Sequence, residues 1–226
     1  MTRRLVPPFV PPFYWTIKTI AWPITRLYVR LKVEGLENVP ASSCILVANH
    51  ASYVDAVVLG SAFPRRVRFM ITAPIYRMLR LRWFYFLMGS IPVSADASYP
   101  GAFKAALRTV QRGGVVGIFP EGQRMPDGRL GEGKAGVALL AARAGVPVVP
   151  AAIIGAHRVM PVGGVLPRPF RIRVVFGRPL RFPSGNGRAG RERLDAFAEE
   201  VMRAIRELMP GQSGALPAGG GIRTTS

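Results

Sequence analysis

The chain has 226 residues, 49% of them apolar, which is long enough for one large domain with a substantial core. Its 31 lysines and arginines against 12 aspartates and glutamates give a formal net charge of +19, so nucleic acid or an anionic membrane is the expected kind of partner. The apolar content and a mean hydropathy of +0.23 favour the membrane. A single cysteine, Cys44, excludes an internal disulfide and a multi-cysteine metal site, and two histidines argue against a histidine-rich metal site.

Residues 1–32 form a basic, aromatic segment that contains no acidic residue. Prolines interrupt it, and no small-residue cleavage site follows an apolar core, so the pattern is not that of a signal peptide. The longest uncharged run, 5–17, is shorter than the roughly 20 residues that cross a bilayer. Residues 13–31 predict an amphipathic helix. It would lie in the membrane interface or dock on the domain core, and the pattern favours neither.

Apolar runs that alternate with helical patterns predict a single α/β domain over residues 33–210. We expect a central mixed, mostly parallel sheet flanked by helices. Strands are expected near 33–40, 44–48, 67–72, 91–93, 115–119, 146–154 and 170–176, and helices over 56–62, 75–88, 100–111, 131–144 and 191–209. The helix at 75–88 mixes arginines with aromatic residues. This favours a membrane interface over a core helix with arginines on its solvent side, because so many adjacent rings exceed what one core face requires. Residues 211–226 are typical of a disordered tail.

The turn after the strand at 44–48 carries His50 and Asp55. A histidine can take a proton from a hydroxyl near neutral pH, and a nearby carboxylate can hold its ring and stabilise the imidazolium. The pattern places Asp55 about one and a half helical turns beyond His50, so the helix would have to curl back for the two to meet. Taken alone, the pair favours a structural histidine at a helix start and a solvated aspartate.

A second polar loop, Pro-Glu-Gly-Gln-Arg at 120–124, follows the strand at 115–119. Ligands of open α/β sheets bind at such strand ends. Glycine lets the backbone approach a ligand, and arginine can grip a phosphate with two parallel hydrogen bonds. Taken alone, the loop is more simply a surface turn with a local ion pair.

Four blocks occur in order: His50 and Asp55 at a spacing of five, Gly-Ser-Ile-Pro-Val at 89–93, Phe-Pro-Glu-Gly-Gln-Arg at 119–124 and Val-Pro-Val-Val-Pro at 146–150. Together they resemble the signature of the glycerolipid acyltransferases, most closely the bacterial 1-acylglycerol-3-phosphate acyltransferases. Looser similarity extends from about residue 30 to residue 182. Four blocks in order outweigh the structural interpretation of each block alone.

The resemblance implies an enzyme that moves a fatty acyl group from acyl-CoA or acyl carrier protein to the free hydroxyl of 1-acylglycerol 3-phosphate, giving phosphatidic acid. No covalent enzyme intermediate, metal or bound cofactor is implied. His50 would be the general base, oriented by Asp55. Glu121, Gly122 and Arg124 would bind the acceptor head group, with Arg124 on its phosphate, and residues 146–150 would line or support the acyl-chain path. The implied substrate site also includes Asn49, Gly89, Pro120 and Lys134.

Two departures from the family pattern concern the acceptor phosphate. Ser-Ala-Asp at 94–96 stands where the family commonly has an arginine, and residues 72–75 lack its usual lysine. Arg68, Arg77 or Lys134 are candidates to replace the lost charge. The alternatives are an acyltransferase for another lyso-lipid, such as a lyso-ornithine lipid or a lysophospholipid, or a non-catalytic basic module that binds membrane or nucleic acid.

The expected partners follow from the same resemblance and from the charge. They are the acyl donor, the lyso-lipid acceptor and an anionic membrane surface, and nucleic acid is not expected. The chain would then lie at the cytoplasmic face of the cell membrane as a peripheral or monotopic protein.

Overall fold

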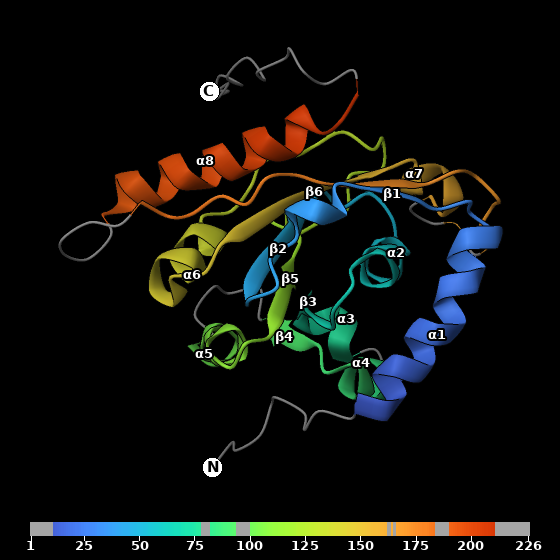
Figure 1. Ribbon diagram of the computed structural model, residues 1–226, viewed down its shortest axis with the longest axis horizontal. Coiled ribbons are helices and arrows are strands. Elements are labelled where there is room, and N and C mark those ends of the chain that lie inside the picture. The colour runs from blue at the N-terminus through green and yellow to red at the C-terminus, as the bar shows by residue number, and fades with distance from the viewer. Residues whose placement is uncertain are drawn as a thin grey trace, which may run out of the picture.

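The structure, a computed structural model, describes residues 11–77, 82–93, 100–161, 164, 166–183 and 190–210. Its α/β domain is built on a seven-stranded sheet with helices on both faces, as the sequence predicts (Figure 1). The strands are β1 (Lys32–Glu34), β2 (Cys44–Ala48), β3 (Val67–Thr72), β4 (Ile91–Val93), β5 (Val115–Ile118), β6 (Val148–Ile154) and β7 (Arg173–Phe176). The predictions for residues 1–10, 78–81, 94–99 and 211–226 concern segments outside the described residues.

The sheet order is β1-β7-β6-β2-β5-β3-β4, which puts β2 at the centre. The five strands from β6 to β4 are parallel to one another, whereas β7 runs antiparallel to β6 and β1 is parallel to β7. The register pairs Val47 of β2 with Ile118 of β5 and with Pro150 of β6. The carboxyl ends of these three central strands therefore open at the same edge, where ligands of such sheets bind.

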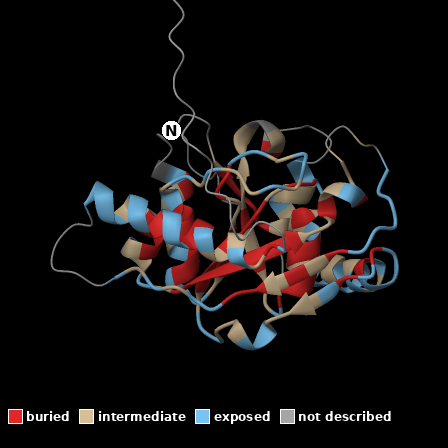
Figure 2. Ribbon diagram, turned by 90° about the horizontal axis from the view of Figure 1, so that it is seen from above, coloured by how far each residue is buried: buried red, intermediate tan, exposed pale blue. Residues whose placement is uncertain are grey.

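Alternate side chains of β2 enter two separate cores, as strand geometry requires. Cys44, Leu46 and Ala48 join the core beneath α2 (Asp55–Ala62) and α7 (Ala156–Val159). Ile45 and Val47 join the core on the opposite face of the sheet. That face is covered by α5 (Pro100–Gln111), α6 (Gly136–Ala144) and α8 (Arg191–Glu207). Buried residues fill the middle of the molecule, and the outer sides of the helices are exposed (Figure 2).

Two predicted helices differ from the structure. The helix expected over 131–144 begins only at residue 136, because glycines at 131, 133 and 136 weaken its first turns and the Lys134 amide bonds the Pro120 carbonyl instead. The helix expected over 75–88 is described as two pieces, α3 (Ala73–Arg77) and α4 (Arg82–Met88). The other helices agree with their predicted bounds to within a few residues.

Helix α1 (Pro11–Leu27) packs against α2 and α4, so the docked alternative describes one side of it. Tyr14 is 2% exposed and its hydroxyl accepts a hydrogen bond from the Val67 amide at 3.2 Å. Large apolar side chains remain exposed beside this docked side: Trp15, Ile20, Trp22, Ile24 and Leu27. None of the described helices is both long enough and apolar enough to span a bilayer.

Candidate active site

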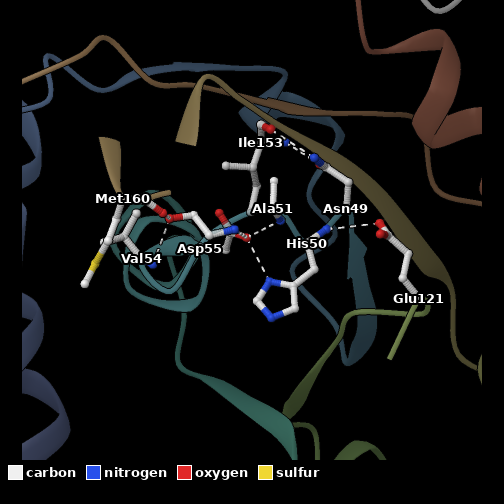
Figure 3. Close-up of polar contacts among 9 residues, drawn as sticks. Asn49, His50, Ala51, Val54, Asp55, Glu121, Ile153 and Met160 are labelled. Carbon is white, nitrogen blue, oxygen red and sulfur yellow. Dashed lines mark hydrogen bonds and ion pairs between the residues drawn. The ribbon is translucent and has the colours of Figure 1, made fainter. Parts of the chain in front are cut away.

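His50 lies just beyond the carboxyl end of the central strand β2, and the neighbouring loop 119–125 contacts it through Glu121 (Figure 3), Met125 and Phe119. Its backbone amide donates to Glu121 Oε1 at 3.1 Å, and its carbonyl accepts from the Met125 amide at 2.8 Å. The imidazole stacks on Phe119 with ring centroids 4.3 Å apart. The two loops that the sequence singled out separately therefore form one site.

The carboxylate of Asp55 fixes the remaining side of the imidazole. Its Oδ2 lies 2.8 Å from His50 Nδ1 and accepts the amides of Ala51 and Ser52, each at 2.7 Å. Asp55 is the first residue of α2 and is fully buried. The prediction that a helix curls back to bring Asp55 to His50 is therefore wrong. Instead, residues 51–54 form a turn that wraps around the carboxylate at the start of the helix, where a negative charge is favourable.

This geometry assigns the tautomer of His50. A carboxylate only accepts hydrogen bonds, so Nδ1 carries the proton and Nε2 of the neutral ring has a free lone pair. In Figure 3, Nε2 points away from Asp55, and no described residue donates to it. The side chain is 18% exposed. His50 is therefore arranged to accept a proton at Nε2.

Asn49 and Ser52 anchor the same turn to the rest of the domain. The Asn49 side chain donates to the Ile153 carbonyl at 3.0 Å and accepts from the Ile153 amide at 2.7 Å, which ties the end of β2 to β6. The Ser52 hydroxyl donates to the Met160 carbonyl at 2.8 Å. Asn49 is buried and points toward Ile153 (Figure 3). The structure thus places it behind His50 and Asp55, away from the open side of the imidazole.

Glu121 is buried, with only 6% of the residue exposed. Burial raises the pKa of its carboxyl to about 7, although the amides of His50 and Gly131 favour the charged form and oppose part of that shift. Pro120 beside it is also buried, and its carbonyl accepts the Lys134 amide at 3.0 Å. These two predicted site residues support the loop from inside.

Arg124 and Lys134 supply positive charge on the outer side of this loop. The Arg124 guanidinium carbon lies 3.9 Å from the ring centroid of Tyr53, which belongs to the turn between His50 and Asp55. Gly122 has a φ of +70°, and a Cβ there would meet Lys134 Nζ at 2.8 Å. The left-handed φ favours glycine at this turn, and the absence of a side chain leaves room for the end of the Lys134 side chain beside it.

Gly89 does not join the other predicted site residues. It precedes β4 at the end opposite to the carboxyl edge, and its carbonyl accepts Arg68 Nε at 2.8 Å. Arg68 also donates to the Thr109 hydroxyl at 3.0 Å, so it is not near Arg124. Of the candidates to replace the missing family charges, Lys134 lies beside the site, and the side chain of Arg77 is outside the described part of the structure.

An apolar pocket lies between α1, α2, α4 and β3, and the sequence did not predict it. Its lining includes Tyr14, Ile17, Gly60, Phe69, Ile71 and Phe84. Phe69 stacks on Phe119 at 5.8 Å, and Phe119 stacks on His50, so the pocket adjoins the candidate base. Residues 146–150 are absent from the lining, since Val148, Val149 and Pro150 belong to the buried central strand β6.

No group of three or more metal-binding side chains occurs within the described ranges. The polar groups at the site are instead a held imidazole, a buried carboxylate behind it and a rim with two cations. Such a set can deprotonate a hydroxyl and hold an anionic substrate.

The chain is similar to acyltransferases in sequence. The acyltransferase family model matches residues 30–154, more than half of the chain. The chloroplast 1-acyl-sn-glycerol-3-phosphate acyltransferase of Brassica napus is 34% identical over 159 residues, which cover 68% of this chain and 46% of that protein. The chain thus spans about half the length of the plant relatives it matches. The 1-acyl-sn-glycerol-3-phosphate acyltransferase of Pseudomonas aeruginosa is 31% identical, over 78% of this chain and 70% of that protein.

A solved structure extends this similarity to the fold. The crystal structure of the 1-acyl-sn-glycerophosphate acyltransferase from Thermotoga maritima superposes with a TM-score of 0.68 at 27% identity. The match covers 86% of this chain and 79% of that one. The family match includes His50, Asp55, Glu121 and Arg124, whose side chains the fold brings to one edge of the sheet. On its sequence and its fold, the chain belongs to the acyltransferase family.

Proposed function

We propose that the protein transfers a fatty acyl group from acyl-CoA or acyl carrier protein to the free hydroxyl of 1-acylglycerol 3-phosphate, giving phosphatidic acid for phospholipid synthesis. The observation that carries the proposal is the position of His50, whose backbone, ring face and Nδ1 are all held while Nε2 is left open. Relatives with the same family domain are named 1-acyl-sn-glycerol-3-phosphate acyltransferases, which supports this choice of acceptor.

In the proposed reaction, Nε2 of His50 accepts the proton of the acceptor hydroxyl as its oxygen attacks the thioester carbonyl carbon. The carbon–sulfur bond then breaks, and the imidazolium gives its proton to the departing thiolate. Asp55 stabilises the imidazolium while it exists. A thioester is already activated, so a positioned base, worth on the order of a hundred- to ten-thousandfold, and correct placement of both substrates meet the need without a cofactor.

The acceptor phosphate would bind at Arg124 and Lys134. Contact with the Tyr53 ring restrains the Arg124 guanidinium, whose parallel donors suit phosphate oxygens. Lys134 adds a second charge across Gly122, and the small glycine lets the phosphate come close to the backbone. The apolar pocket beside Phe69 offers space for an acyl chain next to the reacting groups.

We further propose that the protein lies on an anionic membrane at the cytoplasmic face, where these donors are available. Exposed Trp15, Trp22 and Leu27 on α1 support this placement. The exposed Leu166 and Phe170 extend the apolar surface, because the Tyr28 hydroxyl donates to the Pro167 carbonyl at 2.8 Å and joins their loop to the end of α1. Four exposed arginines of the same region could contact lipid phosphates: Arg26, Arg30, Arg168 and Arg171.

A different lyso-lipid acceptor is the second candidate. The family arginine is replaced by Ser-Ala-Asp at 94–96, and Arg68 is held by Gly89 and Thr109 at the opposite end of the sheet. With the family arginine and lysine absent, the site has fewer cations than the family pattern, which favours a head group with less negative charge than a phosphomonoester.

A panel of lyso-lipids, offered with labelled acyl-CoA or acyl carrier protein to the detergent-purified protein, separates these alternatives. Lysophosphatidic acid should be the best acceptor. Arg124→Gln should raise its KM about tenfold, because a charge-assisted hydrogen bond contributes roughly 1.5–3 kcal/mol. Arg129→Gln is the matched control, because Arg129 is an exposed arginine of the same loop paired with Asp127. Preference for another acceptor would favour the second candidate, and no transfer to any acceptor would indicate a non-catalytic module.

A further inference from the structure

We infer that Glu121 is a positioning residue for His50 rather than a ligand of the acceptor head group. This role rests on the proposed function, because it concerns the same base in the same reaction. It differs from the role that the family resemblance implies, in which Glu121 joins Gly122 and Arg124 on the head group.

Both oxygens of the Glu121 carboxylate face the protein interior. Oε1 accepts the His50 amide at 3.1 Å. Oε2 is buried and lies 3.3 Å from the position that a Cβ on Gly131 would occupy. Only 6% of the residue is exposed, whereas Gly122 and Lys134 around it are exposed. A head group at the rim formed by Arg124 and Lys134 would therefore not reach this carboxylate.

The His50 amide needs a partner from outside the sheet. The last registered pair between β2 and β5 is Val47 with Ile118, so the parallel ladder ends before His50. A buried amide without an acceptor costs roughly 1–3 kcal/mol, and the turn would move to find one. Glu121 supplies that acceptor, and the Met125 amide holds the His50 carbonyl from the same loop. Hydrogen bonds to the backbone amide and to the backbone carbonyl of His50 thus hold the base in place.

Electrostatics also separates the two roles. A carboxylate beside the acceptor phosphate would repel it, since both are anions. A carboxylate behind His50 can serve in either protonation state, because a protonated carboxyl still offers its carbonyl oxygen to the amide. The raised pKa of Glu121 is consistent with a group that stays buried through the reaction.

Steady-state kinetics with Glu121→Ala and Glu121→Gln test this role. Glu121→Ala removes the acceptor for the His50 amide. It should lower kcat about 10- to 100-fold, because a displacement of about 1 Å at the reacting atoms costs about that much, and should leave the KM for lysophosphatidic acid within about twofold. Glu121→Gln keeps an oxygen acceptor and should restore kcat to within about threefold of wild type. A rise in acceptor KM with unchanged kcat, as expected for Arg124→Gln, would overturn the positioning role.

Histidine-labelled NMR provides a readout that does not depend on activity. The chain has two histidines, so His157→Gln leaves His50 as the one histidine signal. On that background, Glu121→Ala should shift or broaden the ring nitrogens of His50, and Glu121→Gln should preserve them. Unchanged ring signals in a folded Glu121→Ala protein would contradict the inference. If the wild type transfers no acyl group, the proposed function fails, but the NMR comparison still decides whether Glu121 holds His50.

Discussion

Replacement of Asp55 by asparagine isolates the charge behind the candidate base. Asparagine has the same shape, and its oxygen can still accept the amides of Ala51 and Ser52 as well as Nδ1–H of His50. The variant lacks the negative charge that would face an imidazolium. A neutral imidazole gains little from that charge, so the loss falls on the step in which the imidazolium forms.

The magnitude follows from the contact distance. At an effective dielectric constant of about 20, two unit charges 2.8 Å apart attract by roughly 6 kcal/mol. The amide dipole of asparagine retains part of this, so we expect a loss of about 4 kcal/mol. Because each 1.36 kcal/mol of barrier is tenfold in rate, Asp55→Asn should lower kcat about a thousandfold.

The assay is steady-state transfer from labelled acyl-CoA to lysophosphatidic acid, with both substrates varied. Substrate KM values should change by less than about threefold, because neither substrate reaches the buried carboxylate of Asp55. A circular-dichroism melt beside it confirms that the variant is folded. A folded Asp55→Asn enzyme whose kcat stays within tenfold of wild type would refute the assignment of His50 and Asp55 as base and stabilising partner.

Three further predictions concern the pH dependence of stability, the preferred length of the acyl donor and binding to the membrane. The pKa of Glu121 is raised from 4.5 to about 7, so the folded state binds more protons across that interval and stability falls as pH rises through it. Glu121→Gln should therefore be more stable than wild type by about 3 kcal/mol at pH 8 and by little at pH 4.5, measured by denaturant unfolding; equal gains at both pH values would contradict this. Gly60→Ala adds a methyl 3.6 Å from Phe69 Cε2, which fits but narrows the apolar pocket. Transfer rates with long acyl donors should therefore fall about fivefold relative to rates with short donors, and an unchanged ratio would mean that the acyl chain binds elsewhere. Serine in place of the exposed Trp15, Trp22 and Leu27 of α1 should weaken binding to anionic vesicles at least about tenfold in a flotation assay. The control Leu36→Ser, also at an exposed position, should not weaken it, and equal binding by both variants would count against α1 as the membrane contact.

The sheet could be predicted because its central strands are continuous apolar runs. β2, β5 and β6 are buried on both faces, so their sequences carry no polar alternation. Helix starts were harder to predict. The α6 start is delayed by glycines and by the bond from Lys134 to Pro120, and that bond is a tertiary contact with no local signal.

The candidate base and its partner could be predicted from their block, but their geometry could not. The sequence gives a spacing of five between His50 and Asp55, which suits a helix that curls back as well as a turn that ends on Asp55. The amides of Ala51 and Ser52 decide between them by bonding the carboxylate. Only the structure shows this.

Neighbours in a sequence block need not be neighbours in a site. Gly89 belongs to a family block, yet it precedes the amino end of β4, whereas His50 follows the carboxyl end of β2, three strands away in the sheet. Glu121 lies next to Gly122 and faces the interior, while Gly122 faces solvent. The apolar pocket collects residues from α1, α2, β3 and α4, and so no single stretch of sequence announces it.

The most direct test of acyl transfer by His50 is product formation from lysophosphatidic acid and labelled acyl-CoA by wild type, His50→Gln and His157→Gln. His157 is the matched control, because it is the other histidine and lies on α7 beside Gly128. We expect wild type and His157→Gln to make phosphatidic acid at rates within about threefold of each other, and His50→Gln to be at least a hundredfold slower, the lower bound for a lost general base. Equal rates for His50→Gln and wild type would contradict the account.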